Sequence, residues 1–300
     1  MGTILKVTGL TKSYGEKMVL DNVSFSIRQG RIYGFIGENG AGKTTAIRTV
    51  MGLSGADEGK IELFGRSDPA GIQEGRRRIG YLVENPILTM NGTAEENLRM
   101  QQLLYGRSDE AKIRAVLERV GLADTGKKKA KDFSLGMRQR LGIALALMND
   151  PELLILDEPV NGLDPMGMIA VRELLKSLCI EDGITIVVSS HILAELYQLV
   201  TDYIMISHGR IIEEVSKSEL DKKCSSCIEI RTEQTEQAIK VLEECGLRDI
   251  ETEGETILIH GEVEQIRVAR IMFDARIFLS GITRHEKSLE DHYIELLGRK

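Results

Sequence analysis

The chain has 300 residues, of which 42% are hydrophobic and 28% charged, and this ordinary composition excludes fibrous and disordered proteins. The formal net charge of −7 argues against a protein built to grip nucleic acid. No apolar run approaches the roughly 20 residues that a membrane-spanning helix needs, and the N-terminus lacks a signal-peptide pattern. We therefore expect a cytosolic chain with one large and one smaller domain, with no nucleic-acid partner, and with its four dispersed cysteines reduced.

The first elements of the chain are predicted to be strands. Apolar side chains recur near every second position between Thr3 and Ile27, which is the period of half-buried strands. The run from Ile32 to Ile36 is apolar throughout and predicts a short buried strand.

A phosphate-binding loop is predicted directly after that strand, with a helix beginning near Lys43. The loop reads Gly37-Glu38-Asn39-Gly40-Ala41-Gly42-Lys43-Thr44 and is followed by Thr45. Glycines at this spacing let backbone N–H groups surround the α- and β-phosphates, while the lysine reaches the β- and γ-phosphates and the threonine hydroxyl binds Mg²⁺. We therefore expect residues 37–45 to bind a nucleoside triphosphate. The alternative is a glycine-rich turn that happens to end in Lys-Thr.

Short strands and a helical segment are expected next. Lys60 to Gly65 and Ile79 to Val83 have the composition of short strands. Helical spacing then occurs in three segments: Thr93 to Leu104, Asp109 to Val120 and Gly136 to Met148. Residues 84–150 are therefore predicted to form a helical insert.

Two acidic residues follow the next predicted strand. Leu153 to Leu156 is apolar throughout, and Asp157 and Glu158 come where this strand would leave a sheet at its carboxyl edge, the edge where nucleotides bind. Asp157 is expected to hold Mg²⁺, and Glu158 to polarise the attacking water. A surface Asp-Glu pair after a strand is a common accident, but the P-loop earlier in the chain favours the catalytic interpretation.

The α/β pattern continues to residue 215. The predicted order is helix Pro165 to Leu178, strand Ile184 to Ser189, helix Ile192 to Leu199, and strands Tyr203 to Ile206 and Arg210 to Val215. We therefore expect residues 1–215 to form a nucleotide-binding domain around a parallel sheet.

Residues 216–300 are expected to form a small accessory α/β domain. The polar stretch from Ser216 to Ser226 predicts a linker. A β-α-β-β-α-β rhythm then predicts a sandwich of ferredoxin-like type. Its segments are a strand Ile228 to Arg231, a helix through Cys245, a strand Ile257 to His260, a helix near Val263 to Phe273 and a strand Ile277 to Ile282, with a final helix from Leu289 to Leu297.

Several motifs, taken in order over residues 3–215, resemble the ATP-binding subunits of ABC transporters. They are Tyr14 in Ser13-Tyr14-Gly15, the P-loop, Glu84, Phe133-Ser134-Leu135-Gly136-Met137, the Asp157-Glu158 strand, Asn161-Gly162-Leu163-Asp164-Pro165, and His191 in Ser189-Ser190-His191. The resemblance implies an ABC-type P-loop ATPase core with an antiparallel β subdomain, which binds ATP and Mg²⁺ and hydrolyses ATP. The chain looks most like the subgroup associated with bacterial export of, or protection from, bacitracin-like and lantibiotic-like peptides.

The resemblance also implies roles for individual residues. Tyr14 would stack on adenine, and Asp164 would lie at a subunit junction. Ser134 and Gly136 would place a hydroxyl and a helix N-terminus against the γ-phosphate of ATP held by another subunit. His191 would contact the γ-phosphate and help hold the catalytic carboxylate. Taken alone, Tyr14 could be an ordinary surface aromatic and His191 a helix N-terminal residue.

Two positions depart from the family pattern. The signature, usually Leu-Ser-Gly-Gly-Gln, reads Phe133-Ser134-Leu135-Gly136-Met137 here. Glu84 stands where most members carry a glutamine near the metal and the water. A carboxylate about 4 Å from another unit charge is worth roughly 4 kcal/mol at an effective dielectric constant of 20, so its direction matters. Our hypothesis is that Glu84 faces Mg²⁺ rather than the phosphate oxygens.

A chain with one P-loop and one signature implies a two-fold dimer. Two copies arranged head to tail would sandwich two ATP molecules. The helical insert would relay opening and closing to integral-membrane permease subunits, which would place the chain at the inner face of the cell membrane. Two other functions stay open: a soluble ABC-type ATPase acting on a ribosome or DNA, and a nucleotide-controlled binding module with little turnover.

Overall fold

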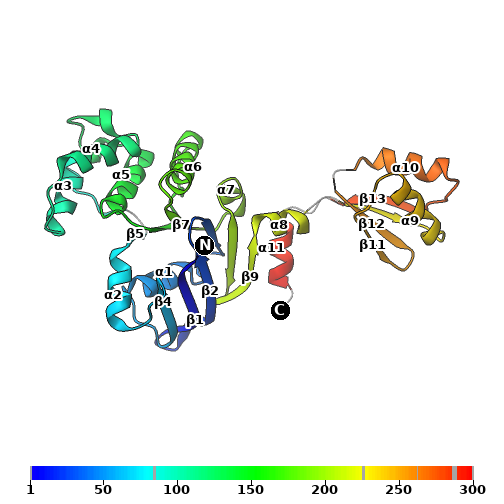
Figure 1. The fold of residues 1–300 in the computed structure, drawn as a ribbon, viewed down its shortest axis with the longest axis horizontal. Coiled ribbons are helices and arrows are strands. Elements are labelled where there is room, and N and C mark those ends of the chain that lie inside the picture. The colour runs from blue at the N-terminus through cyan, green and yellow to red at the C-terminus, as the bar shows by residue number, and fades with distance from the viewer. Residues whose placement is uncertain (1, 84–85, 225–226, 262, 286–288, 299–300) are drawn as a thin grey trace. The chain divides into compact units, whose positions relative to one another are not determined.

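The structure is a computed structural model, and the chain falls into two compact units, Met1–Lys217 and Ser218–Lys300 (Figure 1). The described residues are 2–83, 86–224, 227–261, 263–285 and 289–298.

A mixed sheet forms the centre of the first unit. Its strands lie in the order β5-β6-β7-β3-β8-β9, and all neighbours are parallel except β8 and β9. Their bounds are β3 Ile32–Ile36, β5 Ile79–Leu82, β6 Leu153–Asp157, β7 Thr185–Ser190, β8 Asp202–Ser207 and β9 Arg210–Ser216. Every position of β3, β6 and β7 is buried, as their apolar sequences predict for central parallel strands.

An antiparallel sheet in the order β2-β1-β4 packs against this centre. Its strands are β1 Thr3–Tyr14, β2 Lys17–Arg28 and β4 Glu58–Leu63. Apolar side chains of both sheets share one core, in which the rings of Phe25 and Phe35 lie 5.5 Å apart between centroids. The predicted N-terminal strands are therefore confirmed, and they form the antiparallel β subdomain.

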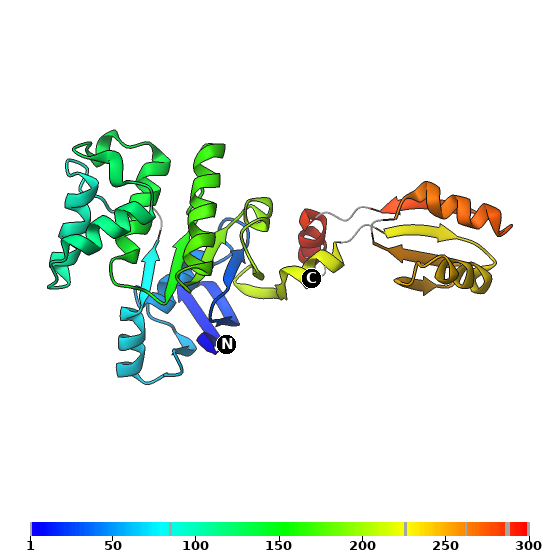
Figure 2. The ribbon, with the colours of Figure 1, turned by 45° about the horizontal axis from the view of Figure 1, so that its top comes forward.

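Helices complete the first unit. They are α1 Lys43–Met51, α2 Pro69–Arg77, α3 Ala94–Leu104, α4 Glu110–Arg119, α5 Leu135–Leu147, α6 Pro165–Ile180 and α7 Leu193–Tyr197. The predicted helical insert is confirmed, since α3, α4 and α5 lie together in both views (Figures 1 and 2). The helix α2 was not predicted, although Asp68 caps it by accepting a hydrogen bond from the Gly71 N–H and Pro69 begins it.

The second unit has the predicted β-α-β-β-α-β order. Its elements are β10 Cys227–Arg231, α9 Thr235–Glu244, β11 Ile250–Glu253, β12 Thr256–His260, α10 Gln265–Asp274 and β13 Gly281–His285. Its strands pair antiparallel in the order β11-β12-β10-β13. Alternate residues of β10 and β12, including Ile230 and Ile257, form a core with α9 and α10. The ferredoxin-like prediction is consistent with this order, and β11 is a strand that the sequence analysis did not place.

Two predictions for this part of the chain are wrong. The stretch Ser216 to Ser226 is not simply a linker, because it holds the helix α8, Lys217–Lys223. The strand predicted from Ile277 to Ile282 begins only at Gly281. Ile277 is apolar because it packs into the core after α10, where its N–H bonds to the carbonyl of Met272, and not because it pairs with a strand. The last helix, α11 Leu289–Gly298, agrees with the prediction.

A glycine in β5 sets how closely α5 approaches the sheet. A Cβ on Gly80 would lie 2.4 Å from the carbonyl oxygen of Ala146, so Gly80→Ala must push the backbones apart. We expect this change to lower the free energy of unfolding by about 1–3 kcal/mol, measured by urea denaturation. Gly55→Ala is the control, because a Cβ there meets nothing within 4 Å. Equal stability of the two variants would contradict the packing described for β5 and α5.

Candidate functional site

The P-loop lies between β3 and α1 and is shaped by glycines. Gly40 and Gly42 have φ of 84° and 110°, which side chains rarely adopt, and Gly42 caps α1. A Cβ on Gly37 would lie 2.4 Å from the carbonyl oxygen of Ile206, so the end of β8 packs directly against the loop. The N-terminus of α1 therefore opens toward the space above the loop, as an anion site requires.

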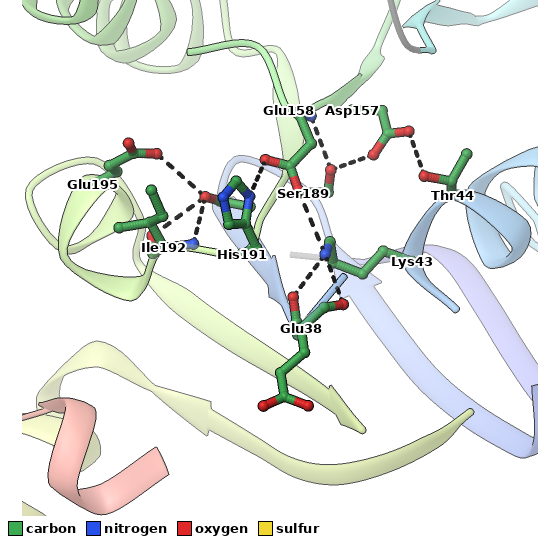
Figure 3. Close-up of polar contacts among 11 residues, drawn as sticks. Glu38, Lys43, Thr44, Asp157, Glu158, Ser189, His191, Ile192 and Glu195 are labelled. Carbon is green, nitrogen blue, oxygen red and sulfur yellow. Dashed lines mark hydrogen bonds and ion pairs between the residues drawn. The ribbon is translucent and has the colours of Figure 1, made fainter. Parts of the chain in front are cut away.

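Lys43 is the cation of this loop, and only 6% of it is exposed. Its Nζ donates to the carbonyl oxygens of Gly37 at 2.6 Å and Glu38 at 3.3 Å, and lies 3.4 Å from Oε1 of Glu158 (Figure 3). The ammonium group is thus surrounded by oxygen atoms at the bottom of the loop. This is an environment in which phosphate oxygens can replace weaker partners.

Thr44 and Asp157 lie side by side, although they come from different elements. Thr44 Oγ1, in the first turn of α1, donates to Asp157 Oδ2 at 2.7 Å, at the carboxyl end of β6. The other carboxylate oxygen of Asp157 accepts a hydrogen bond from the hydroxyl of Ser189, at the end of β7. A threonine hydroxyl and a carboxylate are hard oxygen ligands, so this pair suits Mg²⁺.

Glu158 is held by a histidine and by its own backbone. The Nδ1 of His191 lies 2.9 Å from Glu158 Oε2, and a carboxylate oxygen only accepts, so Nδ1 carries the proton (Figure 3). The φ of Glu158 is 51°, a left-handed conformation, and its N–H donates to Ser189 Oγ at 2.9 Å. The structure thus brings together the predicted residues Lys43, Thr44, Asp157, Glu158 and His191.

Lys43, Thr44, Glu158 and His191 border a cavity of about 650 Å³, and Asp157 lies behind Thr44 without lining it. Its lining comprises Lys17, Met18, Val19, Asn39, Gly40, Gly42, Lys43, Thr44, Thr45, Glu158, Asn161, His191, His208 and Gly209. Two lining residues were not predicted as site residues: Lys17, at the start of β2, and His208, in the turn between β8 and β9. Ser189, in the same motif as His191, was also given no predicted role. Its position as a polar residue at the end of a buried strand could have indicated one.

Tyr14 lies at the end of β1 and is 51% exposed. Its hydroxyl lies 3.1 Å from Ser54 Oγ, and Lys12 Nζ lies 5.4 Å from the ring centroid. Tyr14 is not among the described residues that line the cavity. An open ring of this kind has a face available for a flat ligand such as a base, so stacking on adenine stays a prediction.

The signature residues lie outside that cavity. Ser134 caps α5 and accepts a hydrogen bond from the Met137 N–H at 3.2 Å, and Gly136 lies in the first turn of this helix. Asp164 caps α6 in the same way through the Gly167 N–H. The predicted metal residue Glu84 falls outside the described residues. A single chain therefore places the P-loop and the signature at separate sites.

Comparisons with known proteins give a consistent result. The family described as ABC transporter matches residues 20–161. A bacitracin transport ATP-binding protein from Bacillus licheniformis is 42% identical, over 99% of this chain and 98% of its own length. A lantibiotic transport ATP-binding protein from Streptococcus pyogenes is 44% identical, over 70% of this chain and 90% of its own. A solved dimeric ATP-binding cassette with bound ADP and Pi has a TM-score of 0.64 at 26% identity, covering 71% of this chain and 99% of that one.

The position of Lys43 allows a direct test of the loop. We expect Lys43→Met to weaken binding of a fluorescent ATP analogue by roughly ten- to a hundredfold, since hydrogen bonds to charged groups contribute about 1.5–3 kcal/mol. Fluorescence titration of the full chain measures this affinity. Lys60→Met removes the same charge from an exposed position of β4 and serves as the control. Unchanged affinity in Lys43→Met would show that the loop does not bind the triphosphate.

Proposed function

The chain belongs to the ABC transporter family, and on this basis we propose that it is the ATP-binding and ATP-hydrolysing subunit of a membrane transporter that exports, or protects the cell from, an antimicrobial peptide or similar compound. The observation that carries the proposal is the Glu158 carboxylate, which lies between Lys43 Nζ and His191 Nδ1 beside a P-loop. The substrate class is supported by the names of the bacitracin and lantibiotic relatives.

ATP hydrolysis follows from the groups around the cavity. The α1 N-terminus and Lys43 bind the phosphates, and Thr44 and Asp157 would hold Mg²⁺, which when bound neutralises charge on the phosphate oxygens. Glu158 accepts a hydrogen bond from the attacking water and polarises it toward the γ-phosphate. His191 keeps the Glu158 carboxylate in place through the Nδ1 hydrogen bond and itself borders the cavity.

A second copy of the chain completes the site. Ser134 and Gly136, at the N-terminus of α5, lie outside the cavity that Lys43 and Glu158 border. In a two-fold arrangement the same pair of surfaces meets twice, so each α5 N-terminus faces the γ-phosphate bound by the partner. The solved neighbour that is described as a dimer with ADP and Pi supports this arrangement. Binding of ATP then favours the closed dimer, and hydrolysis removes the contacts that hold it.

A groove of about 510 Å³ is our candidate for the permease contact. It lies between β5, α3 and α5 and is lined in part by Tyr81, Ile87 and Tyr105. Ile87 in the groove is 96% exposed, and Leu103 and Leu104, which directly precede Tyr105 at the end of α3, are also exposed. Exposed large apolar side chains that gather in one region mark interaction sites. The groove lining is part apolar and part polar, with Arg48, Gln101 and Asn149 among its residues, so it fits an amphipathic helix of an integral-membrane subunit.

The permease also accounts for membrane location. None of the helices in the described part of the chain combines the length and apolarity needed to cross a bilayer. We place the chain at the inner face of the cell membrane because a permease bound at the groove of Tyr81, Ile87 and Tyr105 would hold it there.

The catalytic role of Glu158 can be separated from binding. We expect Glu158→Gln to lower ATPase turnover by roughly 10²- to 10⁴-fold, the usual contribution of a general base, while ATP affinity changes little. Because the bound γ-phosphate then persists, ATP should shift this variant to a stable dimer in size-exclusion chromatography. Glu173→Gln, on the exposed side of α6, is the control. Wild-type turnover in Glu158→Gln would reject Glu158 as the main catalytic carboxylate.

The permease groove predicts a separate phenotype. Ile87→Glu puts a charge at the groove without disturbing the core, so we expect the variant to bind ATP normally but to lose its integral-membrane partner. The measurement is co-purification of the full chain with membrane proteins from its native cell. Ile180→Glu changes another exposed isoleucine, 81% exposed at the end of α6, and should retain the partner. Equal membrane association of both variants would place the permease contact elsewhere.

A further inference from the structure

We propose that Ser189 is a positioning residue for ATP hydrolysis, which aligns the metal-binding carboxylate of Asp157 and the backbone of Glu158 with a single hydroxyl. This inference rests on the proposed function. Ser189 is fully buried near the end of β7 and does not line the cavity, so it acts on the nucleotide only through the two acidic residues.

The hydrogen-bond directions at Ser189 are fixed by chemistry. The N–H of Glu158 can only donate, so Ser189 Oγ accepts that bond at 2.9 Å. A carboxylate oxygen can only accept, so the Ser189 hydroxyl donates its one proton to Asp157 Oδ1. The hydroxyl therefore links the side chain of Asp157 to the main chain of Glu158, donating one hydrogen bond and accepting one (Figure 3).

The link to Asp157 fixes the plane of a buried carboxylate. Only 2% of Asp157 is exposed, so its oxygens depend on protein donors. Thr44 donates to Oδ2 from the α1 side, and Ser189 donates to Oδ1 from the β7 side. With a donor at each oxygen, the carboxylate cannot rotate without losing a bond. Asp157 thus keeps the orientation in which it and Thr44 can share a cation.

The link to Glu158 holds a strained backbone. A φ of 51° is unfavourable for a residue with a side chain and persists only where the surroundings enforce it. The bond from the Glu158 N–H to Ser189 Oγ fixes the peptide unit that precedes this conformation. The turn directs the Glu158 carboxylate toward Lys43 and His191. Ser189 therefore supports the direction of the catalytic carboxylate as well as that of the metal ligand.

Strand pairing explains why residue 189 has this role and its neighbour does not. Asp157 and Ser189 are direct partners in the parallel pairing of β6 and β7. The next residue, Ser190, points to a different set of groups, with its Oγ accepting from the Ile192 N–H at 3.0 Å and lying 3.3 Å from Glu195 Oε2. Adjacent residues of a strand face opposite sides, so these two hydroxyls cannot replace each other.

The test is a comparison of full-length wild type, Ser189→Ala, Ser189→Thr and Thr185→Val. Thr185→Val is the control, because it removes a buried hydroxyl from the other end of β7. The bond described for that hydroxyl is one it accepts from the Gly30 N–H. For each protein, the affinity for a fluorescent ATP analogue is measured in EDTA and across Mg²⁺ concentrations, and turnover is measured at saturating ATP. Thermal unfolding verifies that each variant is folded.

We expect Ser189→Ala to bind the analogue in EDTA as the wild type does, because the P-loop is intact. Its half-saturating Mg²⁺ concentration should rise, and its turnover fall, by about ten- to a hundredfold, the usual effect of removing a residue that orients a metal ligand. Ser189→Thr keeps the hydroxyl and should recover most of the Mg²⁺ affinity and most of the turnover. Thr185→Val should behave as wild type. Wild-type Mg²⁺ dependence in Ser189→Ala, or the same loss in Thr185→Val, would overturn the proposal. If the wild type itself hydrolyses no ATP, the proposed function fails, and the Mg²⁺ dependence of binding still decides the role of Ser189.

Discussion

The parallel alignment of β3, β6 and β7 is the constraint on which the site depends, because the carboxyl ends of these strands meet at one edge of the central sheet. β3 leads into the P-loop, β6 ends with Asp157, and β7 ends next to His191. Thr44 and Asp157 are 113 positions apart in sequence, yet their oxygens are 2.7 Å apart. A shift of one residue in the β6–β7 register would turn Asp157 to the opposite face of the sheet. Backbone pairing therefore fixes the geometry of the catalytic groups.

Electrostatics determines what this edge of the sheet can bind. Lys43 Nζ and Glu158 Oε1 are 3.4 Å apart, which corresponds to an attraction of about 5 kcal/mol at an effective dielectric constant of 20. Loss of hydration offsets much of this attraction, because the lysine is buried. A triphosphate brings several negative oxygens to the same ammonium group and competes with Glu158 for it. Under the proposed function, the carboxylate is then released from its ion pair and acts on water, while His191 still holds it by one oxygen.

Sequence alone predicted the parts of the site that are encoded locally. The P-loop and the Asp157-Glu158 pair were recognisable because each is a short motif attached to an apolar strand, and the structure places their side chains together as expected. The contact between Ser189 and Asp157 depends on which strands are neighbours and on their register, which no local pattern contains. The strand that was wrongly predicted to begin at Ile277 also reflects tertiary packing that no local pattern contains. In sequence, a buried apolar residue after a helix resembles the start of a strand. The predicted linker failed because the short helix α8 is polar on most of its surface.

The account requires two copies of the chain for each pair of ATP molecules, and one measurement tests this requirement most directly. It is the specific ATPase activity of the purified full chain across protein concentrations, with the molecular mass in Mg·ATP determined in the same samples. The account predicts that activity per chain rises with concentration and follows the fraction of dimer. Full activity per chain in samples that are strictly monomeric would contradict it.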